Sequence, residues 1–366
     1  MSNPSAKDDA RAAALASFLK EANAKSDNTF FTEYSNPLSV ETIPTGALSL
    51  DYVLGAGGVP RGRICEFFGP EGSGKTSLAL SVCANAIREG GAAGFVDVEH
   101  ALNLTHARWM GVDTNYFVIT QPDSAEEALQ LVETMCESNQ FSVVVVDSVA
   151  SLVPRQELEG EIGDQTMALV GRLMSQALRR LIGVASRTNT TLLFINQLRE
   201  KPGISYGSPE YTPGGRALKF YSSVRLDIRA NAGGQIKVGT GTAQRVIGQT
   251  CVISVKKNKI AAPFRKAEYR LIFGEGIDLS SSIVDTAVAT GIWVTKPGGI
   301  YIDSETGEQV GRGRDAVAAL VAGDPELADA TTKRVMDNMR GAAVVVKEDE
   351  TDLDEDFDLD TQYEAS

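Results

Sequence analysis

The sequence has no long apolar run, and no segment approaches the roughly 20 apolar residues that a membrane-spanning helix requires. Residues 1–9 are polar and lack the apolar core of a signal peptide. Cysteine is scarce: Cys65, Cys83, Cys136 and Cys251 are scattered, and none belongs to a Cys-x-x-Cys motif. We therefore expect a cytoplasmic protein with reduced thiols, and neither a zinc site nor a disulfide framework is indicated.

Positive charge is also in the minority, since 35 Lys and Arg residues stand against 48 Asp and Glu residues, a net charge of -13. Such a balance argues at first against nucleic-acid binding. However, residues 347–366 alone hold about ten acids and one lysine, a net charge of about -9, which leaves only about -4 for the rest of the chain. This tail is too acidic and too poor in apolar residues to fold, so we expect disorder over residues 341–366.

One glycine-rich stretch fits the phosphate-binding loop G-x-x-x-x-G-K-(S/T). An apolar strand over residues 63–68 precedes it and a helix over residues 77–88 follows it, which is the context that the motif requires. In such a loop Lys75 neutralises the β- and γ-phosphates and the Thr76 hydroxyl holds Mg²⁺. The predicted binding residues here are Gly69, Pro70, Glu71, Gly72, Ser73, Gly74, Lys75, Thr76 and Ser77.

Three further apolar runs, residues 94–99, 143–147 and 191–197, end in polar side chains. They predict an α/β fold with a mostly parallel central sheet, in which ligands bind outside the carboxyl ends of the strands. Glu99 is then placed to orient or deprotonate an attacking water, Asp147 to hold Mg²⁺ through water, and Gln197 to sense a γ-phosphate. A solvated acid at position 99 and a capping polar residue at position 197 are the alternatives.

Two segments combine loop composition with basic side chains. Residues 198–216 have neither a helical nor a strand period, and basic residues alternate there with tyrosines, a pattern that suits single-stranded nucleic acid. A second loop, residues 157–167, precedes a predicted helix over residues 168–186 that carries Arg172 and Arg179. Ordinary mobile surface loops are the alternative reading of both segments.

The two ends of the chain are expected to be separate parts. Residues 10–24 predict a short helix that either folds back on the core or docks on a neighbouring subunit. Residues 230–241 predict a glycine-rich turn or a mobile hairpin tip, and the stretch from residue 279 to residue 340 predicts a small α/β domain. The expected organisation is an N-terminal helix and linker over residues 1–37, a nucleotide-binding core over 38–278, the small domain over 279–340, and the tail.

Several runs together resemble the bacterial RecA recombinase family. Besides the phosphate-binding loop they are Ser49-Leu50-Asp51, Glu99-His100-Ala101-Leu102, Val146-Asp147-Ser148-Val149-Ala150, residues 159–164, Ile195-Asn196-Gln197, Ala217-Leu218-Lys219-Phe220-Tyr221 and residues 257–264. The resemblance is densest from residue 42 to residue 276. It implies a RecA-type ATPase core that uses ATP and Mg²⁺, forms helical filaments on single-stranded DNA and catalyses homologous pairing and strand exchange.

The resemblance also assigns roles to residues. It makes Glu99 the catalytic carboxylate and gives Lys75 and Gln197 catalytic roles beside it. It also places Phe220 and Lys219 in a subunit interface. Lys257 and Lys259 are expected at the γ-phosphate of the neighbouring subunit, and Asn103 and His106 against the adenine. The expected DNA-binding residues are Glu161, Ile162, Gly163, Met167, Arg172, Arg179, Arg199, Lys201, Gly214, Gly215 and Arg216.

The chain departs from the family pattern at a few positions. Asn103 and His106 replace the usual Asp and Tyr, and Glu200 and Pro202 change the predicted DNA-binding loop within residues 198–216. Val252 and Ser254 stand where the family has basic residues for duplex DNA. Single-stranded DNA is therefore better supported than duplex DNA as a partner, and we expect Lys237 and Arg245 to supply the missing charge.

Two classes of function remain open from the sequence. One is a DNA-dependent ATPase that exchanges strands; the other is a filament that serves as a platform for self-cleavage of an SOS repressor. A hexameric helicase-like motor on the same core is a third reading, which the N-terminal helix and residues 257–264 make less favourable. The acidic tail is expected either to compete with DNA for basic surfaces or only to solubilise the protein.

Overall fold

The computed structural model describes residues 6–24, 40–160, 169–200, 210–239 and 241–341. The chain divides into two units, residues 1–40 and 41–366. The first unit contains a single described helix, α1 (Ala6–Ala24), which begins four residues before the predicted start. All further elements belong to the second unit.

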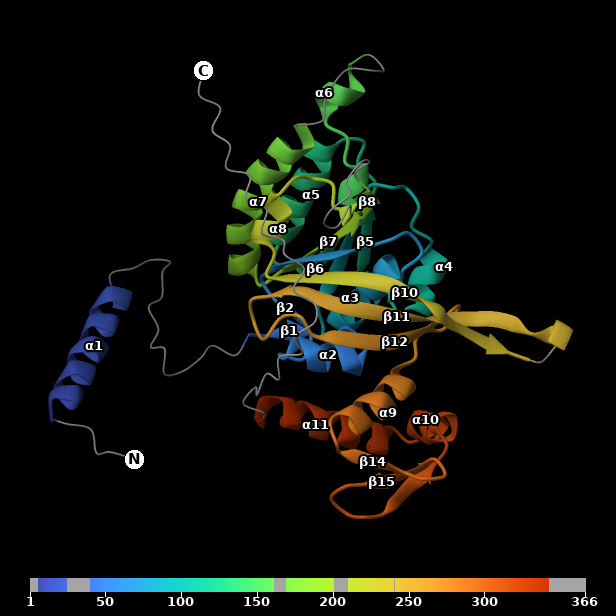
Figure 1. Cartoon of the computed structure of the whole chain (residues 1–366). Helices are drawn as coiled ribbons and strands as arrows, with labels where there is room; N and C mark the ends of the chain where they lie inside the picture. Colours follow the sequence, from blue (N-terminus) through green and yellow to red (C-terminus); the bar gives the residue numbers. More distant parts are fainter. Residues whose placement is uncertain (1–5, 25–39, 161–168, 201–209, 240, 342–366) are drawn as a thin grey trace, which may run out of the picture. The chain divides into compact units, whose positions relative to one another are not determined.

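A nine-stranded sheet forms the centre of the second unit (Figure 1). Six neighbouring strands run parallel, in the order β10 (Val224–Val238), β3 (Ile64–Gly69), β7 (Thr191–Gln197), β6 (Phe141–Asp147), β4 (Ala92–Asp97) and β5 (Phe117–Thr120). Beyond β10, the strands β11 (Arg245–Asn258), β12 (Lys266–Ile272) and β13 (Gly276–Ile277) pair in antiparallel fashion. The predicted mostly parallel sheet is thereby confirmed, and β5 is a strand that the sequence analysis did not predict.

Alternate residues of the central strands enter two different cores. Val143 and Val145 of β6 pack with α3 (Lys75–Arg88) on one face, while Val144 and Val146 pack with α5 (Ala125–Glu137) and α7 (Leu169–Thr188) on the other. Successive strand residues point to opposite faces, so a strand covered on both sides has to be apolar throughout. This explains the unbroken valine run that ends at Asp147.

Short elements connect the main ones. The remaining helices of this part are α2 (Leu48–Leu54), α4 (Leu104–Trp109), α6 (Arg155–Leu158) and α8 (Ala217–Tyr221), with single 3₁₀ turns η1 (Thr114–Tyr116), η2 (Val149–Ser151) and η3 (Gly241–Ala243). Two small antiparallel pairs add β1 (Thr42–Ile43) with β2 (Val59–Pro60), and β8 (Arg199–Glu200) with β9 (Glu210–Tyr211). The prediction of no strand within residues 198–216 was therefore wrong, since both ends of that segment pair with each other.

The hairpin formed by β10 and β11 extends past the rest of the sheet (Figure 1). The described residues of 230–241 form the end of this hairpin, as one of the two predictions for them had it, whereas a turn over the whole segment was wrong because residues 230–238 belong to β10. Gly233 and Gly234 lie in an irregular part of β10, between the paired residues Ala230 and Gln235, which is where glycines are common within strands. Two register shifts lie in this outer part of the hairpin, between Ala230 and Gln235 and between Ile236 and Lys237.

The C-terminal part contains α9 (Leu279–Ala289), α10 (Arg314–Gly323), α11 (Pro325–Gly341) and the antiparallel sheet β14 (Trp293–Lys296), β15 (Ile300–Asp303) and β16 (Gln309–Arg312). These elements share an apolar cluster around Trp293, which Leu48 of α2 also joins. A core of its own agrees with the predicted small domain, although its boundaries stay a prediction. Within the described ranges, no helix combines the length and the apolar character needed to cross a bilayer.

Candidate nucleotide site and nucleic-acid surface

The phosphate-binding loop connects β3 to α3 at the carboxyl edge of the parallel strands. Gly74 caps α3 with φ = 92°, a left-handed conformation that favours glycine, so the first helical N–H groups face the loop. Lys75 Nζ donates to the carbonyl oxygens of Gly69 at 3.0 Å and Pro70 at 2.6 Å. Burial lowers the pKa of Lys75, and Asp147 and Glu99 oppose that shift. The lysine is therefore folded over the loop, where an anionic ligand would restore a favourable partner for its charge.

Thr76 and Asp147 meet beside this loop. The Thr76 hydroxyl donates to Asp147 Oδ2 at 2.7 Å, which joins the first turn of α3 to the end of β6. Desolvation raises the pKa of Asp147 to about 6, and the hydrogen bond from Thr76 opposes the rise. A hydroxyl and a carboxylate at this separation are the hard oxygen donors that Mg²⁺ prefers. The two predicted metal residues thus lie together and fit the ion.

Glu99 and Gln197 also lie together: Glu99 follows the end of β4 and Gln197 ends β7, with β6 between these two strands. Glu99 Oε1 accepts hydrogen bonds from Ser148 Oγ at 2.6 Å, Gln197 Nε2 at 2.8 Å and Ser151 Oγ at 3.2 Å. The carboxylate is exposed to solvent although its position is fixed by these donors. A held but accessible carboxylate can accept a proton or orient a water molecule.

Asp97 shapes the turn that carries Glu99. Strand β4 ends at Asp97, and its buried carboxylate accepts the backbone N–H groups of Ala101 and Leu102 and the side-chain amide of Gln121. These bonds close the chain around residues 97–102, so that Glu99 lies at the outside of the turn. Sequence reasoning missed Asp97, Ser148 and Ser151, although Asp97 lies within a predicted strand, Ser148 within a family run, and Ser151 directly after that run.

A cavity of about 510 Å³ extends from the loop to an aromatic wall. The described residues that line it include His106, Trp109 and Phe273 together with the loop from Gly72 to Ser77. His106 Nε2 lies 3.1 Å from Ser77 Oγ, and burial lowers the pKa of His106, so its ring is neutral at physiological pH. A neutral ring beside an indole is suited to stack with a nucleotide base.

Asn103 has a structural contact of its own. Its Oδ1 accepts the backbone N–H groups of Thr105 at 2.8 Å and His106 at 3.4 Å, which caps α4. This cap orients the helix that bears His106 and Trp109. Contact between Asn103 and an adenine stays a prediction.

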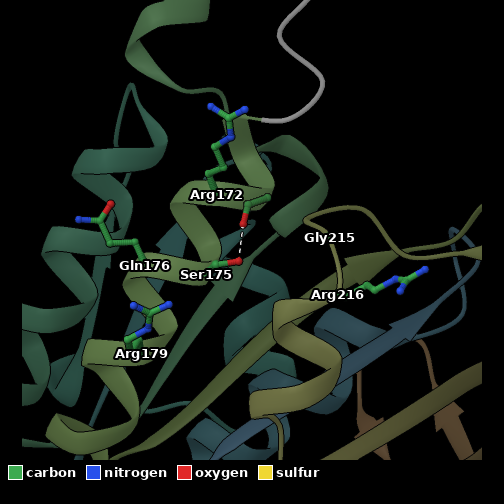
Figure 2. A pocket seen from close by; sticks show the side chains of 7 residues that line it. Arg172, Ser175, Gln176, Arg179, Gly215 and Arg216 are labelled. Atoms are coloured by element: carbon green, nitrogen blue, oxygen red, sulfur yellow. Dashed lines mark hydrogen bonds between the residues drawn. The ribbon is translucent and has the colours of Figure 1, made fainter. Parts of the chain in front are cut away.

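The second surface lies on α7, where Arg172, Gln176 and Arg179 share one face (Figure 2). Gly215 and Arg216, from the segment that leads into α8, complete the cavity lining, and the Ser175 hydroxyl donates to the Gly171 carbonyl inside it. Predicted DNA residues from two distant segments therefore lie around one cationic hollow. Gly214 also precedes α8, and Arg199 is exposed on β8. Glu161, Ile162, Gly163, Met167 and Lys201 lie outside the described residues.

A third group of predicted residues lies around α8. Lys257 Nζ donates to the carbonyl oxygens of Lys219 at 2.6 Å and Phe220 at 3.1 Å, and Lys259 Nζ lies 3.5 Å from the latter. Burial, and then the charge of Lys259, lower the pKa of Lys257. The Phe220 side chain is 69% exposed, which is unusual for a phenylalanine. The chain thus presents two lysines and an aromatic ring on one surface.

The strand, loop and helix around the phosphate site, with Thr76, Asp147, Glu99 and Gln197 gathered at one sheet edge, define a P-loop nucleotide-binding protein. The sequence model of the family described as "RecA N-terminal domain" matches residues 16–278. "Protein RecA" of Thermus aquaticus is 48% identical over 313 residues, which cover 86% of this chain and 90% of the relative. The chain belongs to the bacterial RecA recombinase family.

Other relatives agree with this membership. "Protein RecA" of Syntrophus aciditrophicus is 52% identical over 288 residues, which cover 79% of this chain and 81% of the relative. "Protein RecA" of Chlorobaculum tepidum is 49% identical over 305 residues, with 83% and 86% covered. The predicted resemblance and RecA-type core are thereby confirmed.

Proposed function

We propose that this RecA-family recombinase hydrolyses ATP with Mg²⁺ while it is assembled as a helical filament on single-stranded DNA. The observation that carries the proposal is the hydrogen bond of 2.8 Å between Gln197 and Glu99 beside the phosphate-binding loop. It joins Glu99, which is suited to activate water, to Gln197, which directly precedes the predicted DNA-binding segment over residues 198–216. A change in the bound nucleotide can therefore alter this segment, and DNA bound to the segment can alter the nucleotide site.

The residues divide the chemistry among themselves. Lys75 and the N–H groups of the loop hold phosphate oxygens, and Glu99 orients the attacking water and accepts its proton. Thr76 and Asp147 would hold Mg²⁺, which when bound neutralises developing charge on the phosphates. Gln197 lies at hydrogen-bond distance from Glu99, so it can report whether a γ-phosphate occupies the site.

The cationic hollow on α7 supports single-stranded DNA as the partner. Arg172, Arg179 and Arg216 are exposed, and no described residue that lines this hollow is acidic. Guanidinium groups bind phosphates in bidentate fashion, which gives sequence-independent affinity. The family membership supports the same partner, and duplex DNA follows as the secondary one.

The surface with Lys257, Lys259 and Phe220 supports assembly into a filament. Both lysine head groups are held by backbone carbonyls of α8, although a phosphate would be a stronger partner for each charge. If they complete the ATP site of a neighbouring subunit, assembly becomes dependent on nucleotide. A head-to-tail contact of this kind repeats without closing, which produces a helical filament.

ATP hydrolysis with and without single-stranded DNA, at two salt concentrations, tests the proposal. We expect strong stimulation by DNA that decreases with salt, because phosphate contacts release counterions. Helical filaments in electron micrographs are expected under the stimulated condition. Closed rings would instead favour the helicase-like motor. Hydrolysis indifferent to DNA would contradict the assigned partner.

The outer hairpin gives a second prediction, on duplex DNA. Residues 230–249 hold Lys237 and Arg245, both exposed, and no acidic residue. Replacing both by alanine is expected to make the plot of log affinity for duplex DNA against log salt concentration less steep, by the equivalent of about two phosphate contacts. Binding to single-stranded DNA should be unchanged. Binding titrations over a salt series measure this slope.

The double variant Arg187→Ala with Lys333→Ala is the charge-matched control, since both residues are exposed and lie outside the hairpin. It should keep the wild-type slope. Normal duplex binding by the Lys237→Ala, Arg245→Ala variant would exclude the hairpin as the duplex site. Stimulation of repressor self-cleavage stays a prediction from the family resemblance.

A further inference from the structure

Strand β11 contacts the phosphate-binding loop from the antiparallel part of the sheet. Gln249 Nε2 donates to the carbonyl oxygen of Gly72 at 2.9 Å, across 177 positions of the sequence. Two residues further along β11, Cys251 limits the space at Gly74, where an added Cβ would be 3.2 Å from Cys251 Sγ. The side-chain amide of Gln249 therefore links β11 to the backbone of the loop.

The hydrogen bond from Gln249 fixes the orientation of one peptide group. In a trans peptide the C=O and the following N–H point in opposite directions. Because the Gly72 carbonyl points at Gln249, the N–H of Ser73 points away from β11. In a phosphate-binding loop this is one of the donors that face the anion.

The two residues of this peptide are restrained differently. Ser73 is 2% exposed and is held by packing, whereas Gly72 has φ = 69° and no atom lies within 4 Å of the place where its Cβ would be. Because glycine rotates easily between conformations, the Gly72 side of the peptide depends on hydrogen bonds for its orientation. Gln249 is placed to supply such a bond, and its side chain lines the same cavity as the loop.

We propose that Gln249 is a positioning residue that orients the Gly72–Ser73 peptide for phosphate binding, acting from the root of the β10–β11 hairpin. The position of Gln249 supports this view. Cys251 is fully buried in the core, whereas Arg245 and Val246 are exposed, so Gln249 lies where the hairpin leaves the sheet (Figure 1). The inference rests on the proposed function, because it assumes that the loop binds the phosphates of ATP.

Titration of the full-length protein with a fluorescent ATP analogue tests the inference. Gln249→Leu removes the donor, and we expect the dissociation constant to rise about three- to tenfold, as for loss of one hydrogen bond. Gln249→Glu has the same shape, but its carboxylate cannot donate and repels both the Gly72 carbonyl and the phosphates. Its dissociation constant should rise further. A role in strand packing alone predicts no change for this isosteric variant.

Gln235 offers a matched control. It is an exposed glutamine directly opposite Gln249 on β10, and Gln235→Leu should bind the analogue as the wild-type protein does. Competition with unlabelled ATP, GTP and pyrophosphate separates loop positioning from base contact. In Gln249→Leu we expect all three affinities to fall by the same factor, so that the ratio of ATP to GTP affinity is unchanged.

Steady-state hydrolysis supplies the last readout. The KM for ATP should rise in Gln249→Leu while kcat at saturating ATP is kept, because the chemistry residues are untouched. Wild-type affinity in both Gln249 variants, or a changed ratio of ATP to GTP affinity, would overturn the inference. Absence of analogue binding by the wild-type protein would instead refute the proposed function itself.

Discussion

Replacing Glu99 by glutamine is expected to lower the rate of ATP hydrolysis by about 10²- to 10⁴-fold while ATP still binds. The carboxylate Oε1 is held by Ser148, Gln197 and Ser151 and stays accessible to water. A glutamine fills the same volume, and its amide oxygen can accept the same serine hydroxyls. It cannot take a proton from the attacking water. The loss should therefore fall on turnover rather than on binding.

Single-turnover hydrolysis and nucleotide titration measure the two quantities separately. Ser151→Ala is the control, since Ser151 contributes the longest of the three hydrogen bonds and can be lost without removing the carboxylate. Its effect should be much smaller. Wild-type turnover by Glu99→Gln would show that another group activates the water.

The same variant separates the two classes of function that the sequence left open. A Glu99→Gln protein that still assembles on DNA with ATP is a filament without turnover. Repressor self-cleavage that persists on such a filament would mean that hydrolysis only resets the platform. Strand exchange that stops would mean that hydrolysis is needed for the enzyme reaction.

The parts of the site that could be predicted are those encoded by contiguous residues. The phosphate-binding loop is read from one stretch of eight residues, and Asp147 and Gln197 from the ends of apolar runs. Because parallel strands end at one edge of a sheet, runs far apart in the sequence can be placed together. The contacts of Thr76 with Asp147 and of Glu99 with Gln197 have this origin.

The parts that could not be predicted depend on pairing between distant residues. Glycines at 233 and 234 favour a turn locally, yet the residues on either side of them, Ala230 and Gln235, pair with β11, and the strand continues through the glycines. Gln249 has no motif around it, and only the register of β11 brings it to Gly72. Asn103 was assigned through the family pattern, whereas its contacts in the structure are those of a helix cap.

A buried ion pair between strands β3 and β10 is a further feature that forms only because residues distant in the sequence are paired in the sheet. Arg225 Nε on β10 donates to Glu66 Oε2 on β3 at 2.5 Å, and Asn196 Nδ2 on β7 donates to the other carboxylate oxygen at 3.0 Å. The Glu66 side chain is 0% exposed and the Arg225 side chain 12% exposed. The guanidinium also lies 4.6 Å from the centre of the Phe68 ring. The pair therefore crosslinks the adjacent strands β10 and β3 and is joined to β7 through Asn196, the residue before Gln197.

Arg225→Met is expected to lower the free energy of unfolding by about 3–5 kcal/mol, since it leaves the Glu66 charge buried without its cation. Urea denaturation followed by circular dichroism measures this change. The second variant, Glu66→Gln with Arg225→Met, removes both charges and keeps an acceptor for Asn196. We expect it to recover much of the lost stability, because buried charge is the main cost. If the double variant unfolds as easily as Arg225→Met, the contact of the guanidinium with the Phe68 ring, rather than compensation of the Glu66 charge, supports this part of the sheet.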